Sequence, residues 1–96
     1  PDGSSDNTTI SLSRNATSTG ITVNWTVTSG TAPNVKVCRS LTTNPTYPKS
    51  DCTYITSGTT HTWNIKDGKT YYIRVGKYED GKVTYYSNQI TITAPN

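Results

Sequence analysis

The chain has 96 residues, the size of one small domain, and only 30% of them are hydrophobic, with no Phe and no Met. Its net charge of +3 comes from nine scattered basic residues, which argues against a nucleic-acid-binding stripe. No apolar run approaches the roughly 18 residues that a membrane span needs, so we expect no membrane insertion. The twenty Thr, with Val, Ile, Trp and Tyr, favour strands, and no window has helical periodicity.

The first three strands are predicted from alternation of apolar and polar residues. Residues 9–13, 21–27 and 34–37 alternate, and the side chains expected to face inward are Ile10, Leu12, Ile21, Val23, Trp25, Val27, Val35 and Val37. Residues 1–7 and 95–96 have the composition of linkers, which places the domain at 8–94. Because Pro1 is not a translation start, we expect the chain to be a piece of a larger protein.

Cys38 and Cys52 bracket a stretch with two prolines and no alternation, which predicts a long connection. In a small β domain, two cysteines at this spacing indicate a disulfide and an oxidising compartment. Two free thiols in a cytosolic protein are the alternative.

The remaining strands are predicted at 52–58, 61–65, 71–78 and 82–93, giving seven short strands in all. This number of strands, with turn signals between them, predicts an all-β, antiparallel two-sheet sandwich. Trp25 shares the face of the inward residues of its strand, whereas Trp63 lies beside polar His61 and Asn64. We therefore expect Trp25 to anchor the core and Trp63 to be less buried.

Asp80-Gly81 predicts a tight hairpin turn that pairs Glu79 with Lys82, since both central positions need positive φ. In this register Val75 and Tyr86 face each other inside the core, on the face of Ile73, and Tyr85 covers the bare backbone of Gly76. The side chains expected to point outward include Tyr72, Arg74, Tyr78 and Tyr85.

Several segments together resemble the fibronectin type III domain, an immunoglobulin-like sandwich. Trp25 stands where that family has its core tryptophan, and residues 65–71 (IKDGKTY) are similar to its tyrosine corner. The YIRV segment and the final hairpin ending in ITIT extend the resemblance over nearly the whole chain. The NPTYP stretch is most similar to such domains of secreted bacterial proteins.

The resemblance implies structural roles for Ile65 and Tyr71, with the Tyr71 hydroxyl bonded to nearby backbone. The hairpin turn holds EDGK in place of the integrin-binding tripeptide of some animal members, so that adhesive role is not implied. The cysteine pair is not a general feature of the family.

Catalytic, metal and cofactor sites are not indicated by the sequence. His61 has no partner residue in a recognisable motif and is expected at the surface, and the six carboxylates fall in predicted turns or tails. Cys38, Cys52 and His61 lack the spacing of a zinc site. The sequence therefore predicts a non-catalytic chain without cofactor or metal.

The outward side chains of the last hairpin form a candidate ligand surface made of Tyr72, Arg74, Tyr78, Tyr85 and Lys36. Tyrosine and arginine are enriched at interfaces, and rings displayed flat can stack on sugars. Three interpretations remain: a solvated sheet face, a protein contact, or a carbohydrate platform.

Asn7, Asn15 and Asn24 begin sequons, which matter only if the source glycosylates. We predict a non-catalytic extracellular module, secreted or on the cell surface, that acts as a spacer or protein-interaction domain between flanking domains. The alternative is a carbohydrate-binding module attached to a polysaccharide-degrading enzyme.

Overall fold

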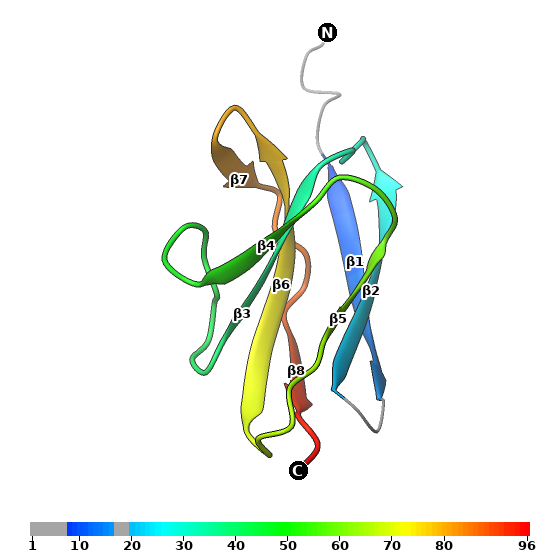
Figure 1. Ribbon diagram of the computed structural model, residues 1–96. Coiled ribbons are helices and arrows are strands. Elements are labelled where there is room, and N and C mark those ends of the chain that lie inside the picture. Colours follow the sequence, from blue (N-terminus) through cyan, green and yellow to red (C-terminus); the bar gives the residue numbers. More distant parts are fainter. Residues whose placement is uncertain (1–7, 17–19) are drawn as a thin grey trace, which may run out of the picture.

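The computed structural model describes residues 8–16 and 20–96, and in this part of the chain the regular secondary structure is all β (Figure 1). The strands are β1 (Thr9–Ala16), β2 (Ile21–Ser29), β3 (Val35–Ser40), β4 (Asp51–Ile55), β5 (Thr60–Trp63), β6 (Thr70–Glu79), β7 (Lys82–Thr84) and β8 (Ile90–Thr93). A small antiparallel sheet has the order β1-β2-β5. A large antiparallel sheet has the order β4-β3-β6-β7, and β8 also pairs with β6.

The two sheets pack face to face, with the hydrophobic core between them (Figure 1). The predicted alternation is confirmed in the core, whose buried members are Ile10, Leu12, Ile21, Val23, Trp25, Val35, Val37, Trp63, Ile73, Val75, Ile92 and Ala94. Val27, Ile65 and Tyr71 are partly buried and pack against this cluster. The core thus draws on both sheets, as their period of two requires.

The two tryptophans lie on neighbouring strands of the small sheet. Trp25 keeps 3% of its surface exposed and Trp63 keeps 9%, so Trp63 is the less buried of the two but still belongs to the core. It pairs with Ile21 at the end of β5. His61 points to the same side, where its ring contacts Trp63 edge-on at 4.8 Å between centroids. His61 is therefore half-buried rather than a surface residue.

The predicted hairpin turn is confirmed. Asp80 and Gly81 have φ of 55° and 76°, and Glu79 pairs with Lys82. Beyond Thr84, however, the strand stops, because Tyr85 also adopts a positive φ of 53°. Pairing with β6 resumes at β8, so the predicted seventh strand is two strands and the described chain has eight.

The interruption moves Ser87, not Tyr86, into the position opposite Val75. The Ser87 N–H donates to the Val75 carbonyl at 2.7 Å, and the Val75 N–H donates to Ser87 Oγ at 3.0 Å. Ser87 is buried. The prediction that Tyr86 faces Val75 in the core is therefore wrong by one residue, the extra residue that the left-handed Tyr85 introduces.

Asn88, which follows in this segment, ties the two sheets together. Its side-chain oxygen accepts the Leu12 N–H at 2.7 Å, and its side-chain nitrogen donates to the Leu12 carbonyl at 3.0 Å. The amide thus pairs with β1 as a neighbouring strand would. Arg14 of β1 also donates to the carbonyl of Thr91 in β8.

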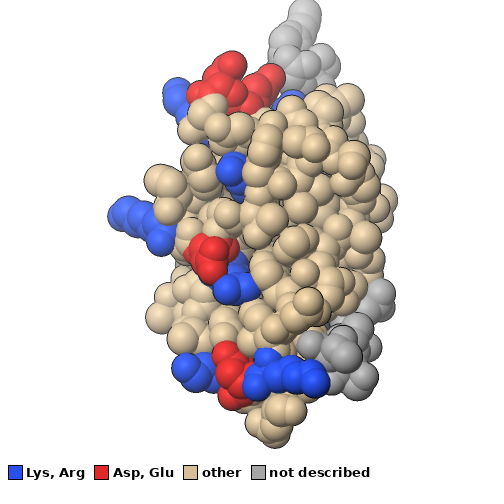
Figure 2. Space-filling model, in the orientation of Figure 1, with Lys and Arg blue, Asp and Glu red and all other residues tan. Residues whose placement is uncertain are grey.

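Among the described residues no helix is long and apolar enough to cross a membrane. Lysine and arginine side chains are interspersed with acidic ones on the face shown in Figure 2, rather than gathered into one stripe.

Candidate functional site

The connection between β3 and β4, residues 41–50, lies against the outer face of the large sheet, and we name it the strap. Pro45 in its centre is fully buried, although the strap has no hydrophobic periodicity. The strap folds back on itself through Ser50, whose N–H donates to the Thr46 carbonyl at 2.7 Å and whose Oγ accepts the Thr46 N–H at 2.9 Å.

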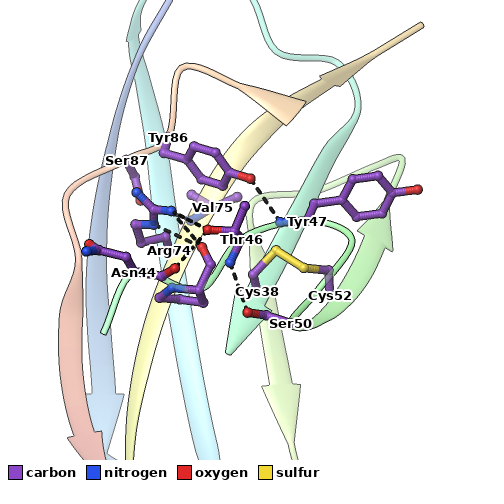
Figure 3. The surroundings of a disulfide bond; sticks show 11 residues. Cys38, Asn44, Thr46, Tyr47, Ser50, Cys52, Arg74, Val75, Tyr86 and Ser87 are labelled. Carbon is purple, nitrogen blue, oxygen red and sulfur yellow. Dashed lines mark hydrogen bonds between the residues drawn. A yellow bond between two sulfur atoms is a disulfide. The ribbon is translucent and has the colours of Figure 1, made fainter. Parts of the chain in front are cut away.

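A disulfide closes the base of the strap (Figure 3). Cys38 and Cys52 are directly paired residues of β3 and β4, with their Cα atoms 4.0 Å apart, which confirms the predicted bond. Cys38 points to the outer face yet is completely buried. The bond thus links two adjacent strands as well as the ends of the strap.

Arg74 of β6 holds the middle of the strap. Its Nε and Nη2 donate to the Pro45 carbonyl at 3.1 and 2.7 Å, and Nη2 also reaches Thr46 Oγ1 at 3.3 Å. The guanidinium lies over the Tyr86 ring, 4.0 Å from its centroid. Arg74 is thus engaged by the protein itself, instead of being displayed as the predicted ligand surface requires.

Tyr86 belongs to this outer face and is half-buried there. Its hydroxyl accepts the Tyr47 N–H at 3.0 Å, which fastens the strap a second time (Figure 3). Gly76 is also covered here: a Cβ at that position would lie 2.3 Å from Val83 Cγ1 and 3.1 Å from Tyr86 Cδ1. The prediction that Tyr85 covers Gly76 is therefore wrong, and Val83 and Tyr86 do so.

Above the disulfide, three tyrosines surround one lysine, and we name these four residues the tyrosine cluster. The Lys36 Nζ lies 4.9, 4.7 and 5.0 Å from the ring centroids of Tyr47, Tyr54 and Tyr78. The Tyr78 ring meets the other two edge-on, at 5.7 Å from Tyr47 and 5.2 Å from Tyr54. The neighbouring Tyr47 phenol, with burial, raises the pKa of Tyr78, so the Tyr78 phenol stays neutral at physiological pH.

The tyrosine cluster contains only two of the five residues predicted for the ligand surface, Lys36 and Tyr78. Tyr72 lies further down β6, half-buried between Ser40 and Thr91. Tyr85 is 41% exposed and lines a shallow hollow with Thr8 and the first residues of β1, away from the cluster. The predicted flat patch is therefore not formed as a unit.

Tyr47 and Tyr54 were missing from the predicted surface. Tyr54 could have been found, because a direct pair between Cys38 and Cys52 in antiparallel strands also pairs Lys36 with Tyr54. Tyr47 lies in the strap, where no pattern gives its direction. Tyr54 is 47% exposed and is the most accessible ring of the cluster, because Tyr47 and Tyr78 are half-buried.

A groove of about 330 Å³ adjoins the tyrosine cluster at the hairpin end of the large sheet. Besides Tyr54 and Tyr78, it is lined by Thr31, Pro33, Asn34, Lys77, Glu79 and Asp80. Lys77 and Glu79 lie 3.9 Å apart as an ion pair. The groove therefore offers hydrogen-bonding groups of both kinds beside aromatic rings.

The opposite end of the molecule carries residues 65–71, the segment whose sequence is similar to a tyrosine corner. The Tyr71 hydroxyl donates to the side-chain carboxylate of Asp67, not to backbone as the family resemblance implied. This bond lowers the pKa of Asp67 and raises that of Tyr71. Ile65 is half-buried against the core, consistent with a structural role.

Arg39 lies beside this corner, 5.4 Å from the Trp63 ring and 5.8 Å from the Tyr71 ring, and pairs with Asp51 at 2.7 Å. Burial and, secondarily, the Arg39 charge lower the pKa of His61. These contacts join β3, β4, β5 and β6 at this end of the sandwich.

Of the three sequons, only the Asn24 side chain lies in the described part of the chain. It is half-buried on β2. Asn7 and the side chain of Asn15 lie outside the described residues.

No family model and no curated protein matches the chain. Among solved structures, the chain is similar to pectate lyase PelI from Erwinia chrysanthemi, with a TM-score of 0.70 and 17% sequence identity. The match covers 86% of this chain and 27% of that chain. At this identity the likeness concerns the fold, and this chain spans only about a quarter of the lyase.

Proposed function

We propose that this chain is a non-catalytic accessory module of a larger extracellular protein. One observation carries the proposal: nearly the whole of this two-sheet domain has its structural counterpart in a minor part, 27%, of a much longer chain. A fold that recurs as a fraction of a longer protein is well suited to serve other domains. Flanking domains of the parent chain are its first expected partners.

The positions of the chain ends support a spacer role. β1 starts at the end of the sandwich that holds the β6–β7 hairpin, and β8 runs to the opposite end (Figure 1). A module with its ends at opposite poles sets the domains before and after it apart. A protein-interaction role would use the outer face of the large sheet, with its exposed Tyr54.

Membership of the fibronectin type III family is part of the proposal. It is supported by a three-stranded sheet packed on a larger one, with Trp25 in the core, and by the position of Tyr71 after the turn at Gly68. The extracellular assignment is supported by the disulfide, because such bonds persist in oxidising compartments.

A carbohydrate-binding module is the second candidate, favoured by one specific observation. The tyrosine cluster and its groove join an exposed ring to polar side chains, which is the combination that small-molecule sites use. One structural neighbour is a pectate lyase, so a similar fold occurs as part of an enzyme that acts on pectate. The T-shaped ring packing, however, leaves no flat platform of the kind expected from the sequence.

Expression of the 96-residue chain by itself tests the accessory role. We expect a cooperatively folding domain with no lyase activity on pectate, measured by the absorbance of unsaturated products. Lyase activity of the purified domain would overturn the proposal. The sequence that precedes and follows this chain in its parent protein is a second test, because an accessory role requires further domains there.

A further inference from the structure

Lys36 is a cation without an acidic partner in the described part of the chain. Of the acidic side chains on the neighbouring strands, Asp51 of β4 pairs with Arg39 and Glu79 of β6 pairs with Lys77. Three ring faces stabilise the Lys36 ammonium, but they accept none of its three N–H donors as a carboxylate would. The ammonium is thus held in place and still able to bind an anion.

The position of Lys36 is fixed from several directions. Lys36 lies two residues before Cys38 on β3, and Tyr54 lies two residues after Cys52 on β4. Tyr47 is fastened by the hydroxyl of Tyr86. The disulfide and the strap therefore preorganise the cluster, which reduces the entropy that a ligand must overcome on binding.

Beside the ammonium, the Tyr54 ring is 47% exposed, and the groove continues toward the hairpin turn. Sugar rings combine an apolar C–H face, which an aromatic ring can cover, with hydroxyl groups that need hydrogen-bond partners. Asn34, Thr31 and Glu79 supply such partners along the groove.

We propose that the tyrosine cluster binds a uronic-acid residue of an acidic polysaccharide. The sugar carboxylate pairs with Lys36, the sugar ring covers Tyr54, and the hydroxyl groups point into the groove. Glu79 and Asp80 both line the groove at the β6–β7 turn, where their charges disfavour a second carboxylate and so set the direction of the ligand. This inference deepens the carbohydrate-binding form of the proposed function and rests on it.

An acidic peptide fits the site less well than a uronate does. A peptide carboxylate would engage the ammonium, but it would leave the Tyr54 face and the row of hydrogen-bonding groups unfilled. Charge alone therefore does not describe the site, and a ligand must satisfy the cation and the ring together.

The test is a titration of the oxidised domain with trigalacturonate, in which binding is measured by calorimetry and by the changes in the NMR chemical shifts of Lys36 and Tyr54. The fully methyl-esterified trisaccharide is the matched uncharged probe, and triglutamate is the matched peptide. We expect trigalacturonate to bind about tenfold or more tightly than either, with affinity falling as salt rises. Equal binding of the ester, or of the peptide, would overturn the inference.

Variants locate the site. Lys36→Met and Tyr54→Ala should each weaken trigalacturonate binding about tenfold, whereas Tyr54→Phe should retain it. Tyr85→Asn is the control, because Tyr85 is exposed to a similar extent, lies outside the cluster, and has a positive φ that Asn tolerates. An equal loss in Tyr85→Asn, or no loss in Tyr54→Ala, would place binding elsewhere. The probe comparison on the wild-type protein stays decisive even if a variant fails to fold.

This inference and the accessory role fail separately. If the wild-type domain binds no trigalacturonate, the uronate site is refuted, and the spacer form of the accessory role is untouched. Lyase activity in the 96-residue chain would instead refute the accessory role, whatever the domain binds.

Discussion

The outer faces of the two sheets differ, although both sheets contribute in the same way to the core. On the small sheet the outer side chains are short and rich in hydroxyl groups. The exposed hydroxyls of Thr22 and Thr62, which are paired on β2 and β5, are hydrogen-bonded to each other at 2.8 Å. On the large sheet, Cys38 and Arg74 lie beneath the strap, and Lys36 is surrounded by tyrosines.

The difference separates what the fold needs from what this chain adds to it. A two-sheet domain needs one buried face on each sheet, and hydroxyl side chains suffice for the other face. The large sheet instead carries a disulfide, a half-buried arginine contact and the tyrosine cluster on its outer face. Any specific binding by this chain is therefore expected there.

The largest effect is expected in the shared core. Trp25→Ala should lower the free energy of unfolding by about 3–5 kcal/mol, because it removes a large side chain that is only 3% exposed. Thr26→Ala is the matched control: it is the next residue of β2 but points outward, so its effect should stay within about 0.5 kcal/mol. Urea unfolding measures both, and similar losses would contradict the division into inner and outer faces.

The second effect distinguishes the two outer faces. Replacing Cys38 and Cys52 together by Ala should cost about 3 kcal/mol, the chain-entropy value for a loop of this length. It should also weaken the NMR cross-peaks (NOEs) between Lys36 and the Tyr47 ring, because the ends of the strap are no longer linked. The resonances of Thr22 and Thr62 on the small sheet should not move, and a comparable change there would show that the disulfide supports the whole fold rather than one face.

The sequence predicted the inner faces well, and the outer face of the large sheet poorly, for a physical reason. Burial in a sandwich repeats every second residue, so Val23, Trp25 and Val75 follow from alternation alone. The strap has no period, and its position depends on contacts such as Arg74 to Pro45 between segments far apart in the chain.

The failed register of Tyr85 and Tyr86 has a local cause. A non-glycine residue with positive φ carries no reliable sequence signal, and Tyr85 shifts the side chains that directly follow it to the other face, whereas Ile90 and Ile92 of β8 still point to the core. Tyr86 consequently moved from the predicted core to the outer face, and Ser87 took its place. The same shift removed Tyr85 from the predicted ligand surface.

A third, smaller effect should come from the contact between β6 and the strap. Arg74→Met keeps most of the apolar stem but removes the two donors to the Pro45 carbonyl, and we expect a loss of about 1–2 kcal/mol. Lys82→Met, an exposed change on β7, should leave the unfolding midpoint nearly unchanged. If the Arg74 variant were as stable as the Lys82 variant, the hydrogen bonds of Arg74 to the strap would contribute nothing to stability.

The smallest effect is expected from His61, on the inner side of the small sheet, and it appears only as a pH dependence. Burial beside Trp63, and then the charge of Arg39, lower the pKa of His61 below its ordinary value of 6.5. The unfolded chain therefore binds a proton at a higher pH than the folded protein does. Stability contributed by neutral His61 is complete above about pH 6.5, falls as the pH drops toward the folded-state pKa, and changes no further below it.

Urea unfolding between pH 8 and 5 should accordingly give a lower midpoint at the acid end, and His61→Gln should flatten that slope. The loss should be modest, because the imidazole is only half-buried. Asp67 does not interfere, since the Tyr71 hydroxyl holds the pKa of that carboxyl below its ordinary value of 3.8, outside this range. If the slope of the urea midpoint against pH were the same in His61→Gln, the inner face would tolerate a charge beside Trp63. The two faces of the small sheet would then differ less than their burial implies.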